Sequence, residues 1–359
     1  MKTRLYTTDY PPARGGVARY LGGLVRYFQG SIGVEVAPAG TRWWQAARWF
    51  VTHRAEYDQL LVSHVLPIGT AAWMAKFVTR KPYVVIVHGM DVGFAKRNAV
   101  KRFVAGCVLR GAKLVVANSM ALEREVTEAF GVERSMVVYP CVREADGAPA
   151  AEHPIVPTSV GDADLRSGHL EPCSSAPIRL LTVARLVPRK GHLRVLDAIQ
   201  ILKARHPELR LSYEIVGDGP EHEQIASHIR DLKLQDVVRI TKDMTDDRLP
   251  TAYETADIFI MPVISDALDR EGFGTVYLEA ALHGVPSIAT WTRGVDEAVI
   301  DGKTGLLVAD GHVDDLADAI YFLSTDLSLR QQLGVEARAR CVREFVPSVQ
   351  FEKLRYVLG

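Results

Sequence analysis

The chain has 359 residues, more than one hydrophobic core usually supports, so we expect two domains. Apolar residues make up 48% of the chain and charged residues 24%, a composition that excludes a largely disordered protein. The 43 basic residues equal the 43 acidic residues in number, which argues against a general nucleic-acid-binding protein.

The equal totals conceal an uneven distribution of charge. Residues 1–143 contain 20 Lys and Arg against 9 Asp and Glu, a net charge of +11. Residues 144–175 contain 1 against 6, and residues 176–359 contain 22 against 28, which gives −5 and −6. A basic first part and an acidic second part indicate two domains that meet different partners.

Short β-rich apolar runs alternate with helical patterns along the chain. The predicted strands are Leu5–Thr8, Gln59–Ser63, Tyr83–Val87 and Leu114–Ala117, followed by Ile178–Val183, Ser212–Val216, Val237–Thr241, Asp257–Met261 and Pro286–Thr290. Continuous apolar runs are typical of parallel strands that helices cover on both faces. The alternation therefore predicts an α/β fold of doubly wound, Rossmann-like domains.

The pattern breaks once, between Glu144 and Pro177, where prolines, glycines and acids replace apolar periodicity. We therefore expect a first domain over residues 1–143, a linker over 144–177 and a second domain over 178–339. The last stretch, residues 340–359, is helical apart from a break at Pro347, and it is a candidate to pack back on the first domain.

The spacing of the cysteines and the composition of the N-terminus predict the cellular compartment of the protein. Cys107, Cys141, Cys173 and Cys341 form no Cys-x-x-Cys pair, so we expect no disulfide framework, no structural zinc site and a reducing compartment. Met1–Pro12 lacks the apolar run of a signal peptide, and we expect a cytoplasmic protein.

Two motifs of the first domain follow predicted strands. Gly15 and Gly16 stand ahead of a helical pattern, where backbone N–H groups suit a phosphate group, although an ordinary strand-to-helix turn has the same pattern. His88 and Asp91 come directly after a buried strand, at the sheet edge where open α/β domains bind ligands. A lone histidine is more often structural, so neither motif identifies a site by itself.

Two motifs of the second domain also follow strands. Arg185 and Lys190 precede a helix, and two cations there match a diphosphate, with a solvated basic turn as the alternative. Glu271 and Glu279 flank a glycine-rich helix start, where the amides of Phe273–Thr275 face an anion and carboxylates hold sugar or ribose hydroxyls. The alternatives are a solvated loop charge for Glu271 and a helix-dipole role for Glu279.

Other patterns exclude common cofactors. The turn that begins at Gly217 imitates a dinucleotide fingerprint, but His222 occupies the position of the third glycine, so we do not expect NAD. The acid pairs at 246–247 and 314–315 are typical of helix caps rather than metal ligands. We expect neither a metal nor a cofactor.

In combination and order, these motifs resemble the retaining GT-B glycosyltransferases of family 4 over essentially the full chain. The strongest match is the E-x7-E element Glu271–Glu279, with Tyr253–Asp257 before it and Gly284–Ala289 and Asp301–Val308 after it. The basic run from Arg185, the Gly217 turn and the Gly15-Gly16 loop fall in the family's order. The resemblance implies two Rossmann-like domains that face each other across a cleft.

The resemblance also implies a nucleoside-diphosphate sugar as co-substrate and assigns residues to it. Arg185 and Lys190 would neutralise the diphosphate, with Gly15-Gly16 closing on it from the first domain. The donor sugar would be held by Glu271 and by the amides of Phe273 and Gly274, with Gly217 and Thr275 in the same donor site, and Glu279 would take the ribose hydroxyls.

The chemistry implied by the resemblance needs no metal. His88 would lie near the sugar and the acceptor, which makes His88 and Glu271 the expected catalytic residues, and Asp91 would lie on the acceptor side. The leaving phosphate oxygen would take the acceptor proton on the same face, so the configuration would be retained. Positioning and charge stabilisation would then supply most of the rate.

One departure from the family concerns Arg293, which replaces the first glycine of a Gly-Gly-x-x-Glu run that ends here at Glu297. Arg293 is expected either to contact sugar or phosphate or to point outward.

Two predicted helices of the basic domain bear on the acceptor side. Residues 42–50 place Trp43, Ala46, Ala47 and Phe50 on one stripe, with Trp44 and Trp49 off it. A second stripe runs from Val100 to Val108, flanked by Arg97, Lys101 and Arg102. Trp together with Arg and Lys suits an anionic membrane surface, and ordinary surface helices with basic faces are the alternative.

We therefore expect a retaining hexosyltransferase in envelope or exopolysaccharide assembly that acts on a lipid-linked or glycan acceptor. We expect it on the inner face of the plasma membrane, without nucleic-acid partners. The alternatives are a soluble enzyme that makes a small glycoside and a catalytically silent nucleotide-sugar-binding subunit.

Overall fold

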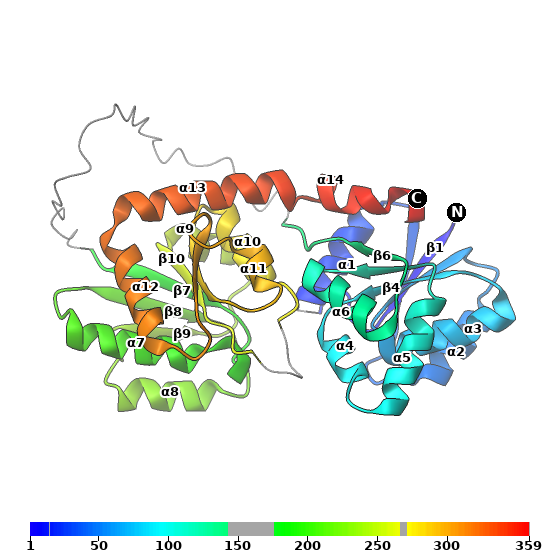
Figure 1. Cartoon of the computed structure of the whole chain (residues 1–359), viewed down its shortest axis with the longest axis horizontal. Helices are drawn as coiled ribbons and strands as arrows, with labels where there is room; N and C mark the ends of the chain where they lie inside the picture. Colours follow the sequence, from blue (N-terminus) through cyan, green and yellow to red (C-terminus); the bar gives the residue numbers. More distant parts are fainter. Residues whose placement is uncertain (14, 143–175, 266–270, 359) are drawn as a thin grey trace.

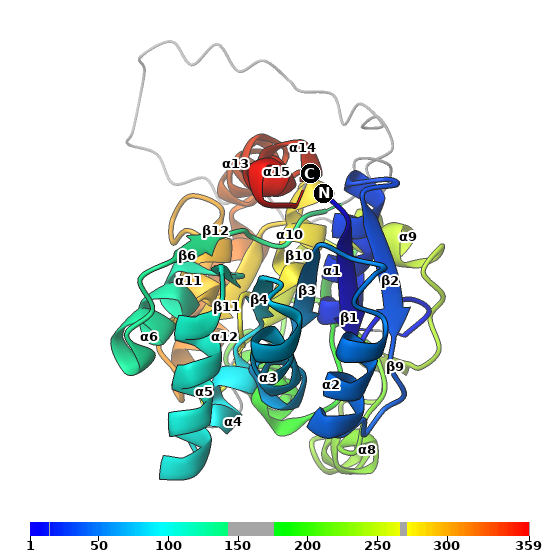
Figure 2. The ribbon, with the colours of Figure 1, turned by 90° about the vertical axis from the view of Figure 1, so that its right-hand side faces the viewer.

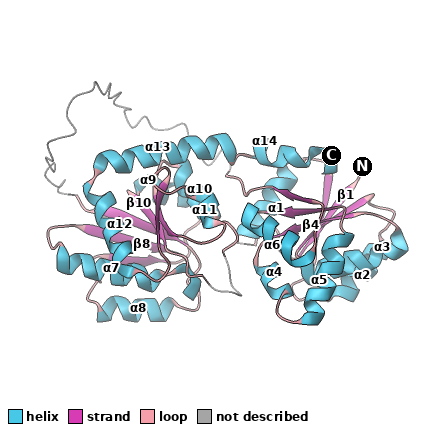
Figure 3. Ribbon diagram, in the orientation of Figure 1, coloured by secondary structure: helices cyan, strands magenta, loops and turns pink. Residues whose placement is uncertain are grey.

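The computed structural model describes residues 1–13, 15–142, 176–265 and 271–358. Two parallel six-stranded sheets lie in two domains arranged along the long axis of the molecule (Figure 1). Helices cover both faces of each sheet (Figure 3). The predicted α/β architecture of two doubly wound domains is therefore confirmed. The segment predicted as a linker lies almost wholly outside the described residues.

The first sheet has the strand order β2-β1-β3-β4-β5-β6. Its strands are β1 (Thr3–Thr7), β2 (Ile32–Val36), β3 (Gln59–Ser63), β4 (Tyr83–Val87), β5 (Leu114–Ala117) and β6 (Ser135–Val137). The helical elements between them are α1 (Gly16–Tyr27), α2 (Trp43–Thr52), the π-helical turn η1 (Val65–Gly69), α3 (Thr70–Thr79), α4 (Met90–Ala95), α5 (Ala99–Gly111) and α6 (Met120–Phe130).

The second sheet has the strand order β12-β11-β10-β7-β8-β9. Its strands are β7 (Ile178–Val183), β8 (Leu211–Val216), β9 (Val238–Thr241), β10 (Ile258–Met261), β11 (Ser287–Thr290) and β12 (Gly305–Val308). The helical elements are η3 (Pro188–Lys190), α7 (His192–Arg205), α8 (His222–Asp231), α9 (Leu249–Thr255), α10 (Thr275–Leu282), α11 (Val295–Ala298), α12 (Val313–Thr325) and α13 (Leu327–Glu344).

Successive side chains of a strand point to opposite faces of the sheet, and in the first sheet both faces are covered by apolar cores. Leu60 and Val62 of β3 face a core formed with α2, α3, α5 and α6, whereas Leu61 faces the opposite core. That opposite core is built with α1 and with the end of the chain, through Phe351 and Leu358. A parallel strand that is buried on both faces needs a continuous apolar run, which is what β3 and β4 have.

The C-terminal segment crosses from the second domain to the first. Helix α13 runs along one side of the second domain, and α14 (Pro347–Gln350), η4 (Phe351–Leu354) and α15 (Arg355–Leu358) lie against the first (Figure 1). The hydroxyl of Thr3 donates to the Leu358 carbonyl at 3.3 Å, and Gln59 Nε2 donates to the Val357 carbonyl at 2.9 Å. The end of the chain therefore completes the core of the domain that contains its beginning.

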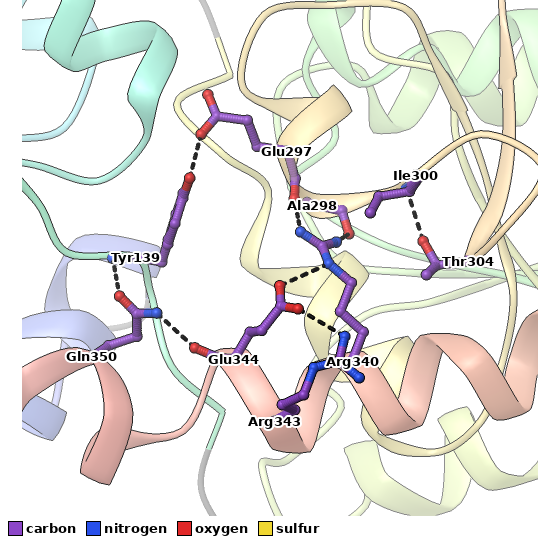
Figure 4. Close-up of polar contacts among 9 residues, drawn as sticks. All are labelled: Tyr139, Glu297, Ala298, Ile300, Thr304, Arg340, Arg343, Glu344 and Gln350. Carbon is purple, nitrogen blue, oxygen red and sulfur yellow. Dashed lines mark hydrogen bonds and ion pairs between the residues drawn. The ribbon is translucent and has the colours of Figure 1, made fainter.

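A polar network joins the two domains where the chain crosses between them (Figure 4). Glu297, in α11, accepts hydrogen bonds from the backbone N–H groups of Met120 and Ala121, both at 2.7 Å, and from the Tyr139 hydroxyl at 2.8 Å. Met120 and Ala121 begin α6, so the carboxylate of one domain satisfies the open N-terminus of a helix in the other. Arg340 of α13 fixes this corner by donating to the carbonyls of Glu297 and Ala298 at 2.7 and 3.0 Å.

This contact predicts the effect of removing the carboxylate. Glu297→Ala should speed hydrogen exchange at the amides of Met120 and Ala121 by about 10-fold or more, because hydrogen bonds to a charged group contribute about 1.5–3 kcal/mol. Tyr139→Phe is the matched control, since it removes one partner of Glu297 and leaves both amide bonds in place. Equal exchange rates in the wild type and in Glu297→Ala would show that the contact does not hold the domains together.

Candidate active site

At the domain boundary the Gly272 loop lies against the backbone at the end of β4, the Asn118 side chain and the backbone near Gly294. A Cβ atom on Gly272 would lie 2.6 Å from the His88 carbonyl oxygen and 2.9 Å from Asn118 Nδ2. A Cβ atom on Gly294 would lie 2.6 Å from the Gly272 carbonyl oxygen. The glycine-rich loop of the second domain therefore lies directly on the end of β4, and it brings the predicted residues Glu271 and His88 to the same region.

Glu271 lies at the centre of a buried cationic cluster. Its carboxylate forms ion pairs with both Arg189 and Lys190, and all three side chains are at most 15% exposed. Burial raises the pKa of Glu271, and the charges of Lys190 and Arg189 lower it. The two charges together outweigh the burial, so the pKa of Glu271 is below its ordinary value. Glu271 is therefore an anion that holds two cations in place.

The start of α10 has backbone donors that no described residue uses. No described residue accepts a hydrogen bond from the N–H groups of Phe273, Gly274 or Thr275. Gly274 has φ +85°, and a Cβ atom there would lie 2.5 Å from the Tyr277 ring, so only glycine fits. Gly16 of the first domain faces this helix start, because its Cβ position is 3.9 Å from Thr275 Oγ1.

Glu279 makes a contact across the domains that the sequence pattern did not predict. Its Oε1 accepts from Arg19 of α1 at 2.6 Å, and its Oε2 accepts from the Tyr253 hydroxyl at 2.8 Å. Arg19 also lies 3.5 Å from Asp246. The carboxylate predicted to take ribose hydroxyls thus interacts with a cation of the first domain.

Other predicted donor residues lie apart from this cluster. The Arg185 side chain is exposed, and among the described residues it has no hydrogen-bond or ion-pair partner. Gly217 is required by packing, since a Cβ atom there would lie 1.9 Å from the Ala184 carbonyl oxygen. Arg293 is exposed, and the second glycine of its motif, Gly294, keeps the close backbone approach. The roles of Arg185 and Gly217 toward a donor stay predictions.

His88 is half-buried at the end of β4, where its Nε2 lies 3.2 Å from Ser63 Oγ. The ring also packs edge-on against Tyr20, with the centroids 5.8 Å apart. Burial, and to a smaller extent the neighbouring His64, lower the pKa of His88 to about 3. The imidazole is therefore neutral near pH 7 and acts through hydrogen bonds rather than through a charge.

Asp91, predicted on the acceptor side, is 8% exposed and directs its carboxylate at backbone amides. Its Oδ1 accepts from the N–H groups of His88 and Val92, both at 3.0 Å, and its Oδ2 accepts from that of Val65 at 3.3 Å. Asp91 thus ties the loop after β3 to the loop after β4.

An open groove lies beside these loops in the first domain. It has a volume of about 640 Å³, within the range of small-molecule sites. Its lining residues follow β1, lie before and at the start of α2, and follow β3: Thr8, Gly40, Thr41, Arg42, Trp43, Trp44, His64, Leu66, Pro67 and Ile68. Trp43 and Trp44 are 45% and 49% exposed, whereas Ala46 and Phe50 of the same helix are buried. Trp43 therefore differs from the rest of its predicted stripe, because it begins the helix and faces the groove.

The predicted basic flank includes exposed apolar side chains. Val100 and Phe103 of α5 are 73% and 69% exposed, and Lys101 Nζ lies 3.6 Å from the centroid of the Phe94 ring. We call Phe94, Val100 and Phe103, with Arg97, Lys101 and Arg102, the α4–α5 patch. The predicted second stripe is buried only in its later part, where Val108 packs in the core.

Three residues beside the predicted ones were not predicted from the sequence: Arg189, Arg19 and His64. Arg189 lies next to Lys190 in one basic run, and that run was the available signal. Arg19 and His64 carry no motif, because their positions depend on how the domains and loops pack.

Two family profiles match consecutive parts of the chain. The profile of the glycosyl transferases group 1 matches residues 174–340, and that of the glycosyl transferase 4-like domain matches residues 3–141. A GDP-mannose-dependent alpha-(1-6)-phosphatidylinositol monomannoside mannosyltransferase of Mycolicibacterium smegmatis is 29% identical, over 93% of this chain and 92% of the relative. A D-inositol 3-phosphate glycosyltransferase of Paenarthrobacter aurescens is 30% identical, over 63% of this chain and 52% of the relative.

Solved structures share the fold at low identity. HepE of Anabaena in complex with UDP and glucose has a TM-score of 0.78 at 20% identity, covering 100% of this chain and 99% of that one. Sucrose-phosphate synthase of Thermosynechococcus elongatus has a TM-score of 0.80 at 17% identity, covering 99% and 98%. Taken with the two profiles and the two facing sheets, these matches place the chain in the GT-B glycosyltransferases of family 4, group 1.

Proposed function

We propose that this glycosyltransferase moves a hexose, with retention of configuration, from a nucleoside-diphosphate sugar to a lipid-linked acceptor. The observation that carries the proposal is the contact between the Gly272 loop and the His88 carbonyl. This contact brings a cation cluster, a free helix start and a polar strand end to one place. A donor bound there has its diphosphate beside cations and its sugar facing the first domain.

In the proposed step, the bond from the sugar C1 atom to the diphosphate oxygen breaks, and a bond from C1 to the acceptor oxygen forms on the same face. The acceptor proton passes to the leaving diphosphate oxygen. Lys190 and the amides of Phe273–Thr275 stabilise the charge that grows on the leaving group. Glu271 keeps Lys190 in position and accepts hydrogen bonds from sugar hydroxyls, and neutral His88 contributes a hydrogen bond near the sugar.

The relatives favour GDP-mannose as the first donor to test. The mannosyltransferase of M. smegmatis that aligns over 93% of this chain is GDP-mannose-dependent by name. Structural neighbours bind UDP, so UDP-sugars form the second arm of a donor screen. A bound nucleotide stabilises the fold by mass action, which makes thermal shift a direct readout. The proposal needs no cofactor other than this co-substrate.

The groove of the first domain is the proposed acceptor site. Its lining offers two exposed Trp faces, the hydroxyls of Thr8 and Thr41, and the guanidinium of Arg42. Such a set suits a polyol ring that carries a phosphate, because hydroxyls accept and donate hydrogen bonds and Arg binds phosphate through paired donors. The names of the relatives include phosphatidylinositol monomannoside and D-inositol 3-phosphate, which belong to this chemical class.

The α4–α5 patch is the proposed contact with an anionic membrane. Helix α5, which carries Val100 and Phe103, packs beside α3, and α3 packs beside α2 (Figure 2). Exposed Val100 and Phe103 enter the interface, while Arg97, Lys101 and Arg102 meet anionic headgroups. No helix among the described residues is long and apolar enough to span a bilayer. We place the enzyme at the inner face of the plasma membrane.

The proposed reaction is tested by measuring transfer from GDP-mannose and UDP-glucose to phosphatidylinositol in vesicles and to inositol 1-phosphate in solution. Lys190→Ala should lower kcat/KM for the donor about 10- to 150-fold, because a charge-assisted hydrogen bond is worth about 1.5–3 kcal/mol. Arg205→Ala is the control, since Arg205 pairs with Asp314 on the surface of the same domain. Donor binding without transfer in the wild type would point to a silent binding subunit, and transfer only to the soluble acceptor would point to a small-glycoside enzyme.

The two glutamates should separate in binding. Glu279→Ala should weaken the affinity for free GDP or UDP, because its carboxylate is the proposed ribose ligand. Glu271→Gln should keep most of that affinity and lose transfer instead. Calorimetry with the free nucleotide measures the first effect, and the donor assay measures the second. The reverse order would contradict the allocation while leaving the family assignment intact.

Membrane docking should depend on both components of the α4–α5 patch. Reversing Arg97, Lys101 and Arg102 to Glu should weaken the free energy of binding to anionic vesicles by several kcal/mol, since each basic residue contributes about 1 kcal/mol at such a surface. Co-sedimentation with the vesicles measures this binding. Phe103→Ser should weaken binding at high salt, where the charge attraction is screened. Tyr356→Ser is the control, because Tyr356 is 97% exposed on the C-terminal segment. Failure of the wild type to sediment at low salt would exclude the docking surface.

A further inference from the structure

His64 has a backbone conformation that histidine rarely adopts. It follows β3 with φ 78° and ψ 136°. This ψ value lies well outside the small left-handed helical region that non-glycine residues occasionally enter. Such a conformation costs free energy and persists only where the surroundings impose it, typically at functional sites.

Hydrogen bonds on both sides hold His64 in this conformation. Its N–H donates to the Ile86 carbonyl at 3.1 Å, and its carbonyl accepts from the Gly69 N–H at 3.2 Å. The next amide, of Val65, donates to the Asp91 carboxylate, which also accepts from the His88 N–H. Asp91 therefore fixes His64 relative to His88, and their ring centroids are 5.6 Å apart.

The His64 imidazole is presented at the groove between two polar partners. Its Nδ1 lies 3.1 Å from Ser63 Oγ, and its Nε2 lies 3.5 Å from Asp9 Oδ2. The same Ser63 hydroxyl lies 3.2 Å from His88 Nε2, so one buried hydroxyl contacts both histidines. The side chains of His64 and Asp9 are 24% and 47% exposed, and His64 is one of the residues that line the groove.

A separation of 3.5 Å between Nε2 and Oδ2 is too long for a strong direct hydrogen bond and too short to enclose a hydroxyl group. The half-exposed Asp9 side chain can change rotamer, which admits a hydroxyl group that binds to both. The hydroxyl oxygen accepts from Nε2–H, and its own proton is donated to the Asp9 carboxylate. This hydroxyl is not the reacting one, because the reacting hydroxyl gives its proton to the leaving diphosphate. It is a second hydroxyl of the acceptor, which sets the orientation of the ring.

We propose that His64 and Asp9 together bind a non-reacting hydroxyl of a polyol acceptor and so align the reacting hydroxyl with the donor. The inference rests on the proposed function and adds a specificity element to it. A site built to hydrogen-bond a hydroxyl rejects acceptors that lack it, because its own polar groups are then left unpaired. The groove therefore selects acceptors that carry more than one hydroxyl.

The test combines His64→Gly and Asp9→Asn with GDP-mannose and UDP-glucose as donors and inositol 1-phosphate or phosphatidylinositol vesicles as acceptors. His64→Gly should melt at or above the wild-type temperature, because glycine adopts this backbone conformation freely. Both variants should lose about 10- to 100-fold in kcat/KM for the acceptor, with the affinity for GDP or UDP unchanged. The double variant should lose no more than either single variant, because the two residues bind one hydroxyl.

Two further variants serve as a control for the backbone change and as a replacement in case of misfolding. Lys233→Gly makes the same kind of change at another residue of positive φ, in the second domain, and should leave transfer unchanged. His64→Ala keeps the backbone strain that the wild type already bears and removes the imidazole, so it replaces His64→Gly if that variant fails to fold. Wild-type acceptor kinetics in the His64 and Asp9 variants, or an equal loss of nucleotide affinity, would overturn the inference alone. A wild type that neither transfers to these polyols nor binds them, by fluorescence of Trp43 and Trp44, would overturn the proposed acceptor class and this inference with it.

Discussion

The close approach of the Gly272 loop to the end of β4 is the constraint on which the rest of the site depends. A side chain at Gly272 would collide with the His88 carbonyl, and one at Gly294 would collide with Gly272 itself. Only glycine therefore fits at these two positions, and the Gly272 loop approaches the end of β4 directly.

The two domains differ in net charge, and the contacts between them pair opposite charges. The first domain is basic and the second is acidic, and the contacts between them have the matching sign: Arg19 binds Glu279, and the N-terminus of α6 binds Glu297. Inside the second domain, Glu271 balances Arg189 and Lys190, so that two buried cations are tolerated without a bound anion. In the proposed function, these are the cations that an incoming diphosphate would meet.

In the first domain, a buried carboxylate joins the loops that carry the two histidines. The loops after β3 and β4 carry His64 and His88, and the Asp91 carboxylate binds amides of both loops. A single buried carboxylate thus makes two separate strand ends behave as one unit. The C-terminal segment packs against the core of this domain and continues from α13 of the second domain. It therefore links the position of the second domain to that of the first.

The sequence by itself determined the class of the fold and most of its central strands. Gln59–Ser63, Tyr83–Val87, Leu114–Ala117 and Ile178–Val183 were predicted with the bounds that the structure has, because strands buried on both faces are continuous apolar runs. Strands β2, β6 and β12 were missed, and all three lie at sheet edges. Partial exposure removes the signal from β2 and β6, whereas β12 is largely buried but is a run of only 4 residues. The glycine-flanked glutamates were also found from sequence, since their spacing marks a helix start. Tertiary structure alone decided that Asp91 binds backbone amides, that Trp43 faces a groove, and that Arg19 and His64 belong to the site. These roles depend on contacts between residues far apart in the chain, and no local spacing encodes such contacts.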